Sequence, residues 1–161
     1  MTARGGRRPR KRKPAKRPEN ESSWSDVVVA VIRDGDKVLV TRRPPGAHLG
    51  DHDEFPGGRR AAGEALADAC TREVKEEVGL DVTVEKPLHI GWYEGEGRRL
   101  ALTFFECRVR GSTALDPKVV SERGARWVEV SQLPTLKFPP ANAGVVRLLA
   151  GGAAPPAHET S

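Results

Sequence analysis

Residues 58–80 read GRRAAGEALADACTREVKEEVGL, and this stretch predicts an amphipathic helix that carries a cluster of carboxylates. Glu73 lies three residues before Glu76 and four before Glu77, so the three side chains share one face of a helix. Like charges at this spacing destabilise an isolated helix by about 0.2–0.5 kcal/mol per pair. Either this face is an ordinary solvated surface, or the carboxylates hold a hard cation such as Mg²⁺, which takes oxygen ligands and keeps water and substrate phosphates as its others.

The residues around the cluster predict how the helix is placed. Gly57 and Gly58 allow a tight turn and a close approach of the backbone to a ligand. Glu64 is expected in the first helical turn, where a carboxylate complements the helix dipole, and Gly79 is expected to end the helix. Apolar residues at three- and four-residue steps mark the buried stripe, namely Leu66, Ala69, Cys70, Val74 and Val78. The glutamates occupy the neighbouring stripe, so burial of the apolar face can direct them into a cleft.

The spacing of this stretch resembles the signature of the Nudix hydrolase superfamily. Nine positions match, in the order Gly58, five residues, Glu64, seven residues, Arg72-Glu73, Val74, one residue, Glu76-Glu77, one residue, Gly79, Leu80. The resemblance implies an α/β class fold, an α/β/α sandwich with a mixed sheet and two principal helices. It also implies hydrolysis of a phosphoanhydride with Mg²⁺, or Mn²⁺ as an alternative, as cofactor.

The resemblance further implies roles for individual residues. Glu76 and Glu77 are expected as metal ligands together with the backbone carbonyl of Gly57. Glu73 is expected as a ligand or as the base for the attacking water, and the sequence does not decide which glutamate accepts the proton. Arg72 is expected to hold the glutamates in register.

Further strings resemble the MutT branch of this superfamily, over residues 24–150 in all. They are Thr41-Arg42-Arg43, Ala47-His48, Glu54-Phe55-Pro56-Gly57-Gly58 and Phe138-Pro139-Pro140-Ala141-Asn142. Enzymes of that branch cleave nucleoside triphosphates to the monophosphate and pyrophosphate and favour 8-oxo-guanine nucleotides. By the same resemblance Asn142 reads the base edge and Arg43 and Phe55 line the substrate pocket. The ordinary alternatives are that Asn142 caps the last helix, Phe55 is a core residue and Arg43 is a surface charge.

Three positions depart from the MutT pattern. Asp53 stands where an apolar or aromatic residue is usual, and Ala61 stands where an acidic residue is common. A further metal-binding glutamate is expected six residues before Trp127, where this chain has Ser121, with Glu122 one step off register. Either a shortened loop lets Glu122 serve, or that ligand is absent.

Because of these departures, other functions stay open. Another substrate of the same chemistry is one alternative, such as a pyrimidine triphosphate, a dinucleoside polyphosphate or a nucleotide sugar. A binding or regulatory module without catalysis is another, although such a module has no physical need for clustered acids.

Charge is distributed very unevenly along the chain of 161 residues, whose net charge is +5. Residues 1–23 carry nine basic and two acidic side chains, a net charge of +7, which leaves −2 for the rest. This basic segment has almost no apolar residues, so we expect it to be disordered and to attract nucleic acid weakly and in a salt-dependent way. It lacks interleaved aromatic residues, so the sequence does not predict base stacking. Residues 24–150 are expected to form one domain and residues 151–161 a second disordered tail.

The remaining patterns predict strands over Asp26–Ile32, Lys37–Thr41, Val82–Tyr93, Leu100–Val109 and Arg126–Val130, a loop over Arg43–Pro56, and helices over Glu64–Val78 and Pro139–Leu149. The two cysteines, Cys70 and Cys107, fall on buried patterns and predict reduced thiols in a cytoplasmic protein. No apolar run is long enough to predict a membrane span.

Overall fold

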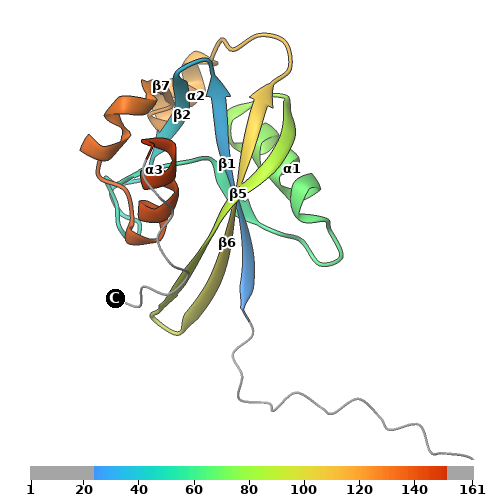
Figure 1. Ribbon diagram of the computed structural model, residues 1–161, viewed down its shortest axis with the longest axis vertical. Coiled ribbons are helices and arrows are strands. Elements are labelled where there is room, and N and C mark those ends of the chain that lie inside the picture. The colour runs from blue at the N-terminus through green and yellow to red at the C-terminus, as the bar shows by residue number, and fades with distance from the viewer. Residues whose placement is uncertain (1–23, 152–161) are drawn as a thin grey trace, which may run out of the picture.

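The computed structural model describes residues 24–151, and a mixed β-sheet runs through the centre of this part (Figure 1). The sheet order is β3-β2-β1-β6-β5, with β4 also paired to β1 and β7 to β2. The strands are β1 (Ser25–Asp34), β2 (Lys37–Arg42), β3 (Asp53–Glu54), β4 (Gly57–Arg59), β5 (Val82–Gly95), β6 (Arg98–Val109) and β7 (Arg126–Glu129). Strands β1 and β6 are parallel, and the other pairs are antiparallel. The predicted mixed sheet is therefore confirmed.

Helices cover both faces of the sheet, which gives the predicted α/β/α sandwich. Helix α1 (Leu66–Val78) lies on one side of the sheet and α3 (Ala143–Leu149) on the other (Figure 1). A short helix α2 (Pro117–Arg123) precedes β7, and the 3₁₀ turns η1 (Val130–Thr135) and η2 (Pro140–Asn142) lead into α3.

Strand β1 is buried on both faces because successive side chains point to opposite sides of the sheet. Val28, Ala30 and Ile32 join the core beneath α1, whereas Val29 and Val31 join the core beneath α3. Full burial of one such aliphatic side chain contributes roughly 1.5–3 kcal/mol. Four residues of the predicted helical stripe are buried, namely Ala69, Cys70, Val74 and Val78, and Leu66 packs partly buried against them. Cys70 and Cys107 are buried free thiols.

Several boundaries differ from the sequence expectations. Glu64 lies outside α1, because the helix begins after Ala65, so it does not act from the first helical turn. The predicted last helix is divided into η2 and α3, since two prolines and Asn142 hold the chain in a tighter turn first. Helix α2 and the two-residue strand β3 were not predicted, because neither is long enough to show a period.

The terminal predictions concern residues outside those that the structure describes, 1–23 and 152–161, and stay predictions. Within residues 24–151, no helix is both long and apolar enough to cross a bilayer.

Candidate active site

A polar cleft of about 360 Å³ opens where α1, the β3–β4 segment and the end of α2 meet. Seven residues line it: Arg43, Glu54, Gly57, Glu73, Glu76, Glu77 and Arg123. Three of the four acids come from α1, because burial of the helix's apolar stripe turns the adjacent stripe toward β4. The structure therefore brings the predicted glutamate cluster, Gly57 and Arg43 to one place.

Two glycines of β4 make the close approach of α1 possible. A Cβ atom at Gly58 would collide with the carboxylate of Glu73, and one at Gly57 would collide with the carbonyl of Val28 on β1. Neither backbone has a positive φ, so what these positions require is space and not a special conformation. A side chain at Gly58 would displace the Glu73 carboxylate, and one at Gly57 would push β4 away from β1.

Glu77 lies deepest in this cluster, with its side chain only 11% exposed. Its Oε2 accepts a hydrogen bond from the Gly57 N–H at 3.0 Å. Burial raises the pKa of Glu77 to about 7, and the neighbouring carboxylates of Glu54 and Glu73 act in the same direction. The Gly57 N–H and the Arg123 guanidinium oppose this shift without cancelling it.

Glu54 is a second carboxylate of the cleft whose negative charge is only partly balanced by neighbouring cations. Burial raises its pKa, although Arg43 Nη1 donates to its Oε2 at 3.1 Å. Two neighbouring acids with raised pKa values mean that additional positive charge in the cleft would stabilise both ionised forms.

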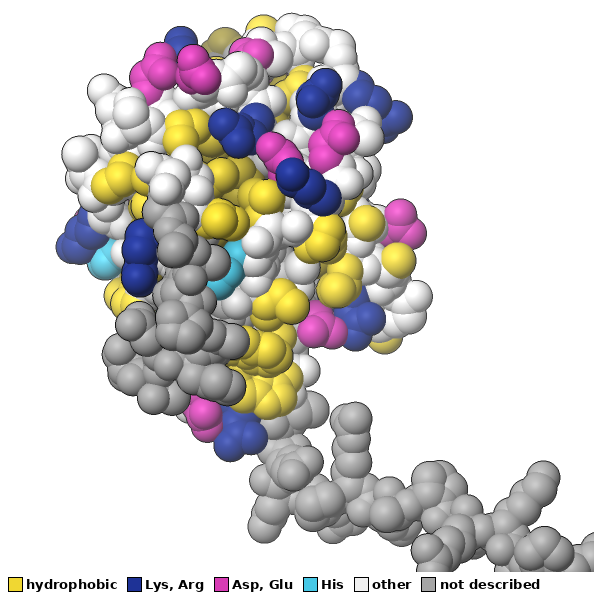
Figure 2. Space-filling model, viewed as in Figure 1, with side chains coloured by type: hydrophobic (Ala, Val, Ile, Leu, Met, Phe, Trp, Pro, Cys, Tyr) yellow, Lys and Arg dark blue, Asp and Glu magenta, His cyan; other side chains and the backbone are white. Residues whose placement is uncertain are grey.

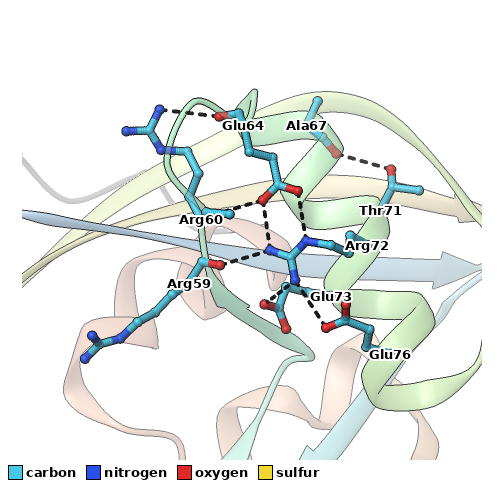
Figure 3. A network of polar contacts seen from close by, with 9 residues as sticks. Arg59, Arg60, Glu64, Ala67, Thr71, Arg72, Glu73 and Glu76 are labelled. Atoms are coloured by element: carbon cyan, nitrogen blue, oxygen red, sulfur yellow. Dashed lines mark hydrogen bonds and ion pairs between the residues drawn. The ribbon is translucent and has the colours of Figure 1, made fainter.

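Arg72 ties the acids of α1 to the loop before the helix (Figure 3). Its Nε and Nη2 donate to the two carboxylate oxygens of Glu64 at 2.8 Å each, and Nη2 also donates to the Arg59 carbonyl at 3.1 Å. Its Nη1 donates to Glu73 at 3.0 Å and to Glu76 at 3.2 Å. The hydrogen bonds from Arg72, with help from the Ala61 N–H, lower the pKa of Glu64 to about 2. Arg72 is thus placed to set the positions of both glutamates.

The donor chemistry of the cleft fits a hard divalent cation, since carboxylate oxygens are the ligands that Mg²⁺ prefers. In the described part of the chain, no three acidic, histidine or cysteine groups yet converge closely enough to hold a metal ion. The reason is visible in the contacts: Glu73 and Glu76 are bound by Arg72, and Glu77 by Gly57. A complete site would need these carboxylates to turn toward the cleft, with water and phosphate as further ligands.

Helix α2 presents a different residue to the cleft than the sequence suggested. Glu122 is exposed, and its nearest ion-pair partner is Lys118 at 3.9 Å on the same helix. Arg123 lines the cleft instead, with its Nη1 3.9 Å from Glu77 Oε1. Ser121 is exposed as well and donates to the Lys118 carbonyl. The geometry gives no support to Glu122 as a substitute metal ligand.

The residues expected to hold the nucleotide are divided between two places. Arg43 lines the acidic cleft, whereas Phe55 and Asn142 do not. Phe55 is 4% exposed and stacks on Phe138 with ring centroids 4.8 Å apart, within the core beneath α3. Asn142 is also buried, yet its side chain does not cap α3. Its amide makes no hydrogen bond to another described residue, and because no buried side-chain N or O atom among them lacks a partner, the amide atoms reach solvent.

Sequence reasoning missed two residues of the cleft, Glu54 and Arg123. Glu54 belongs to a strand of two residues whose direction is set by pairing with Thr41, so no local pattern reveals it.

The departure of Asp53 from the MutT pattern has a structural reason. Its buried carboxylate accepts from Arg126 Nη2 at 2.6 Å and lies 3.8 Å from Arg42 Nε, so a paired charge replaces an apolar contact.

Comparison with known proteins agrees with this architecture. Residues 24–149 match the family model described as the NUDIX domain. The 8-oxo-dGTP diphosphatase of Escherichia coli K12 is 32% identical over 130 residues, which cover 76% of this chain and 94% of that protein. The CTP pyrophosphohydrolase of the same organism is 32% identical over only 77 residues, 48% of this chain and 57% of that protein.

Solved structures show the same fold. The MutT protein of methicillin-resistant Staphylococcus aureus 252 superposes with a TM-score of 0.66 at 26% identity, over 80% of this chain and 97% of that one. The ORF135 protein of E. coli superposes with a TM-score of 0.68 at 23% identity, over 81% of this chain and 91% of that one.

Proposed function

Because this chain belongs to the Nudix family and is a nucleoside triphosphate pyrophosphohydrolase, we propose that its substrate is 8-oxo-dGTP, cleaved to the monophosphate and pyrophosphate with Mg²⁺. In this proposal the enzyme acts in the cytoplasm and removes oxidised precursors before they enter DNA. The E. coli relative named for this activity matches across most of both chains, whereas the CTP pyrophosphohydrolase matches less than half of this chain, which favours 8-oxo-dGTP.

One observation carries the proposal: four carboxylates and two guanidinium groups line a single cleft. Carboxylates in this number suit a divalent cation, and guanidinium groups suit phosphate oxygens, which they bind with directional hydrogen bonds. A cleft that offers both is suited to a polyphosphate chain that is neutralised by metal.

In the proposed mechanism, Glu73, Glu76 and Glu77, with the Gly57 carbonyl, would hold Mg²⁺. When bound, the cation withdraws charge from the phosphate oxygens that become more negative during hydrolysis. Arg43 and Arg123, which also line the cleft, would bind phosphate oxygens and hold the polyphosphate for in-line attack by water. A glutamate of the cluster accepts the proton of that water, and Arg72 keeps Glu73 and Glu76 in position.

Base recognition is assigned to Asn142. An amide offers both a donor and an acceptor, which is what a purine edge requires. Its side chain makes no hydrogen bond to the described residues, and none of their buried side-chain N or O atoms lacks a partner, so the amide reaches solvent and can bind a base. Phe55 supports the pocket through its stacking on Phe138, four residues before Asn142.

A pyrimidine triphosphate is the second candidate, because a CTP pyrophosphohydrolase is among the relatives. Pyrophosphate release from 8-oxo-dGTP, dGTP and dCTP, each with and without Mg²⁺, separates the candidates. The proposal expects the highest kcat/KM for 8-oxo-dGTP and no release when the metal is chelated. A preference for dCTP over both purines would identify a pyrimidine triphosphate as the substrate. If no nucleotide released pyrophosphate, the protein would be a binding module.

We also retain, as a proposal, the weak attraction of residues 1–23 to nucleic acid.

A further inference from the structure

Two cysteine thiols are in contact in the core between α1 and the sheet. Cys70 belongs to the buried stripe of α1, and Cys107 lies on β6. Their sulfur atoms are 3.7 Å apart, and both residues are free thiols. Neither residue lines the acidic cleft, so the pair has no direct part in the proposed hydrolysis.

The topology explains why the two thiols meet. Strand β6 lies between β1 and β5, and Cys107 is paired with Ile32 on one side and with Val84 on the other. Its side chain faces the core beneath α1. Cys70 lies one helical turn before Val74 in the stripe that packs on this face. The two cysteines are 37 residues apart in the chain and meet only because α1 packs on the sheet (Figure 1).

The surroundings of the pair are apolar and closed. Figure 2 shows the outer surface of one face, where hydrophobic side chains lie between charged ones, whereas each cysteine belongs to the core and is only 1% exposed. Contact with the Cys70 thiol, and then burial, raise the pKa of the Cys107 thiol above its ordinary value. Because the thiolate is the reactive form, the pair should react slowly, and only with a small reagent that enters during local opening of the core.

The two sulfur atoms are placed to join each other and not a second molecule. The S–S bond of a disulfide is about 2.05 Å long, so the sulfurs have to approach by roughly 1.7 Å. Side-chain rotation and a small shift of α1 on the sheet can supply this distance. The chain contains two cysteines in all, so no other thiol of the same chain competes. Burial keeps glutathione and other protein thiols away.

We propose that Cys70 and Cys107 are a site of oxidative modification, at which hydrogen peroxide converts the two thiols to a disulfide that joins α1 to β6. In the first step an oxygen of peroxide bonds to one sulfur, the O–O bond breaks and water leaves, which gives a sulfenic acid. The second sulfur then attacks the sulfenic sulfur. An S–S bond forms, the S–O bond breaks, and the hydroxide leaves with the thiol proton as water. Two electrons pass from the thiols to one molecule of peroxide.

The bond would anchor the helix that carries the acidic cluster, since Cys70 lies three residues before Glu73. A disulfide that closes a loop of 37 residues restricts the unfolded chain and should raise the melting temperature by roughly 10 °C. The ordinary alternative is that both cysteines only fill space as small apolar side chains. In that case peroxide leaves them unlinked.

Peroxide treatment of the reduced full chain, followed by thiol counting in denaturant and peptide mapping by mass spectrometry, tests this inference without nucleotide or metal. The wild type should lose both thiols over minutes to hours and about 2 Da of mass, with the peptides of Cys70 and Cys107 crosslinked. Dithiothreitol should restore both thiols. The oxidised protein should melt roughly 10 °C above the reduced protein.

Cys107→Ala and Cys70→Ala each remove one partner. The remaining thiol should stay reduced or gain oxygen, and peroxide should not raise the melting temperature of either variant. Cys107→Val keeps an apolar side chain of similar size and replaces Cys107→Ala if that variant does not fold. Thr71→Ala is the matched control, because Thr71 is next to Cys70 but is not among the buried residues of α1, and this variant should form the disulfide as the wild type does.

Two thiols that remain titratable after peroxide treatment of the folded wild type would overturn the proposal and assign both cysteines to core packing. Crosslinked dimers on a non-reducing gel would overturn it as well, because they require the thiols to leave the core. A disulfide that lowers the melting temperature would show that the fold opposes the bond, which also contradicts the proposal. Loss of pyrophosphate release from every nucleotide would overturn the proposed function and leave these results unchanged.

Discussion

At the scale of single residues, Glu77 carries the clearest conflict between burial and charge. Its carboxylate is held by one backbone N–H and is crowded by other acids, and its pKa is raised to about 7. Glu77→Gln keeps the size and the hydrogen bond to Gly57, so melting in the presence of a chelator should be unchanged or slightly higher. The rate at saturating Mg²⁺ should fall by orders of magnitude, because the charge that holds the cation is lost. Turnover near that of the wild type would contradict the metal site.

Replacement of Arg123 tests whether the guanidinium group that α2 brings to the cleft binds substrate phosphate. Charge-assisted hydrogen bonds contribute about 1.5–3 kcal/mol when buried, and exposure reduces this figure. Arg123 is 49% exposed, so Arg123→Ala should weaken binding of a non-hydrolysable triphosphate analogue by about tenfold or less. Calorimetric titration measures this effect apart from turnover. Glu122→Gln is the control on the same helix, and a larger effect there would restore Glu122 as the missing ligand.

Asn142 tests base recognition. Asn142→Ala should reduce kcat/KM for 8-oxo-dGTP about tenfold to a hundredfold, because hydrogen bonds worth about 1–3 kcal/mol are left unmade. The loss for dCTP should be much smaller, since the acidic cleft is untouched. Specificity constants for 8-oxo-dGTP, dGTP and dCTP in both proteins provide the comparison, and a uniform fall across the three would assign Asn142 to the fold.

At the scale of elements, the loop before α1 is joined to the helix by Glu64 and Arg72. The pKa of Glu64 falls from its usual 4.5 to about 2, so the ionised form is favoured in the folded state. The contribution of Glu64 to stability is therefore complete above the unfolded pKa and is lost as the pH falls toward 2. Glu64→Gln should lower the melting temperature at pH 7 and converge with the wild type in strong acid.

The control for this prediction is Glu129→Gln, an exposed glutamate of β7 for which the described residues show no ion pair. Its melting temperature should follow the wild type at every pH. If the melting temperatures of Glu64→Gln and wild type differed by the same amount at all pH values, the stabilisation by Glu64 would not be electrostatic.

Elements with a strong period could be predicted from the sequence, and short ones could not. Helix α1 is predicted by apolar residues at helical steps, among them Ala69, Val74 and Val78, and β1 is predicted by a run of β-branched residues. The direction of Glu54, by contrast, depends on pairing between β3 and β2, and the rotation of α2 decides whether Glu122 or Arg123 faces the cleft. Successive residues on a helix point about 100° apart, so an error of one residue in register exchanges an acid for a base.

At the scale of the whole molecule, the long strands β1, β5 and β6 carry two different surfaces. Strand β1 pairs with β4, whose Gly58 packs against the Glu73 carboxylate of α1. Trp24 lies directly before the same strand, and its ring contacts that of Trp92 on β5. The contact between Trp24 and Trp92 could not be predicted from the sequence, because the two residues are far apart in the chain and meet only through strand pairing.

The core, the cleft and the network around Arg72 are all built from residues 24–151, which leads to a prediction for the complete chain. Deletion of residues 2–23 should leave the melting temperature and the hydrolysis of free nucleotide nearly unchanged, since no described contact of the core or cleft depends on them. The deletion removes a charge of +7, so the remaining domain carries −2 and should no longer bind single strands at low salt. Thermal melting, pyrophosphate release and anisotropy on the two proteins test the three parts. A large loss of hydrolysis on free nucleotide would show that the basic segment completes the active site, because only direct participation there would couple it to a small, unattached substrate.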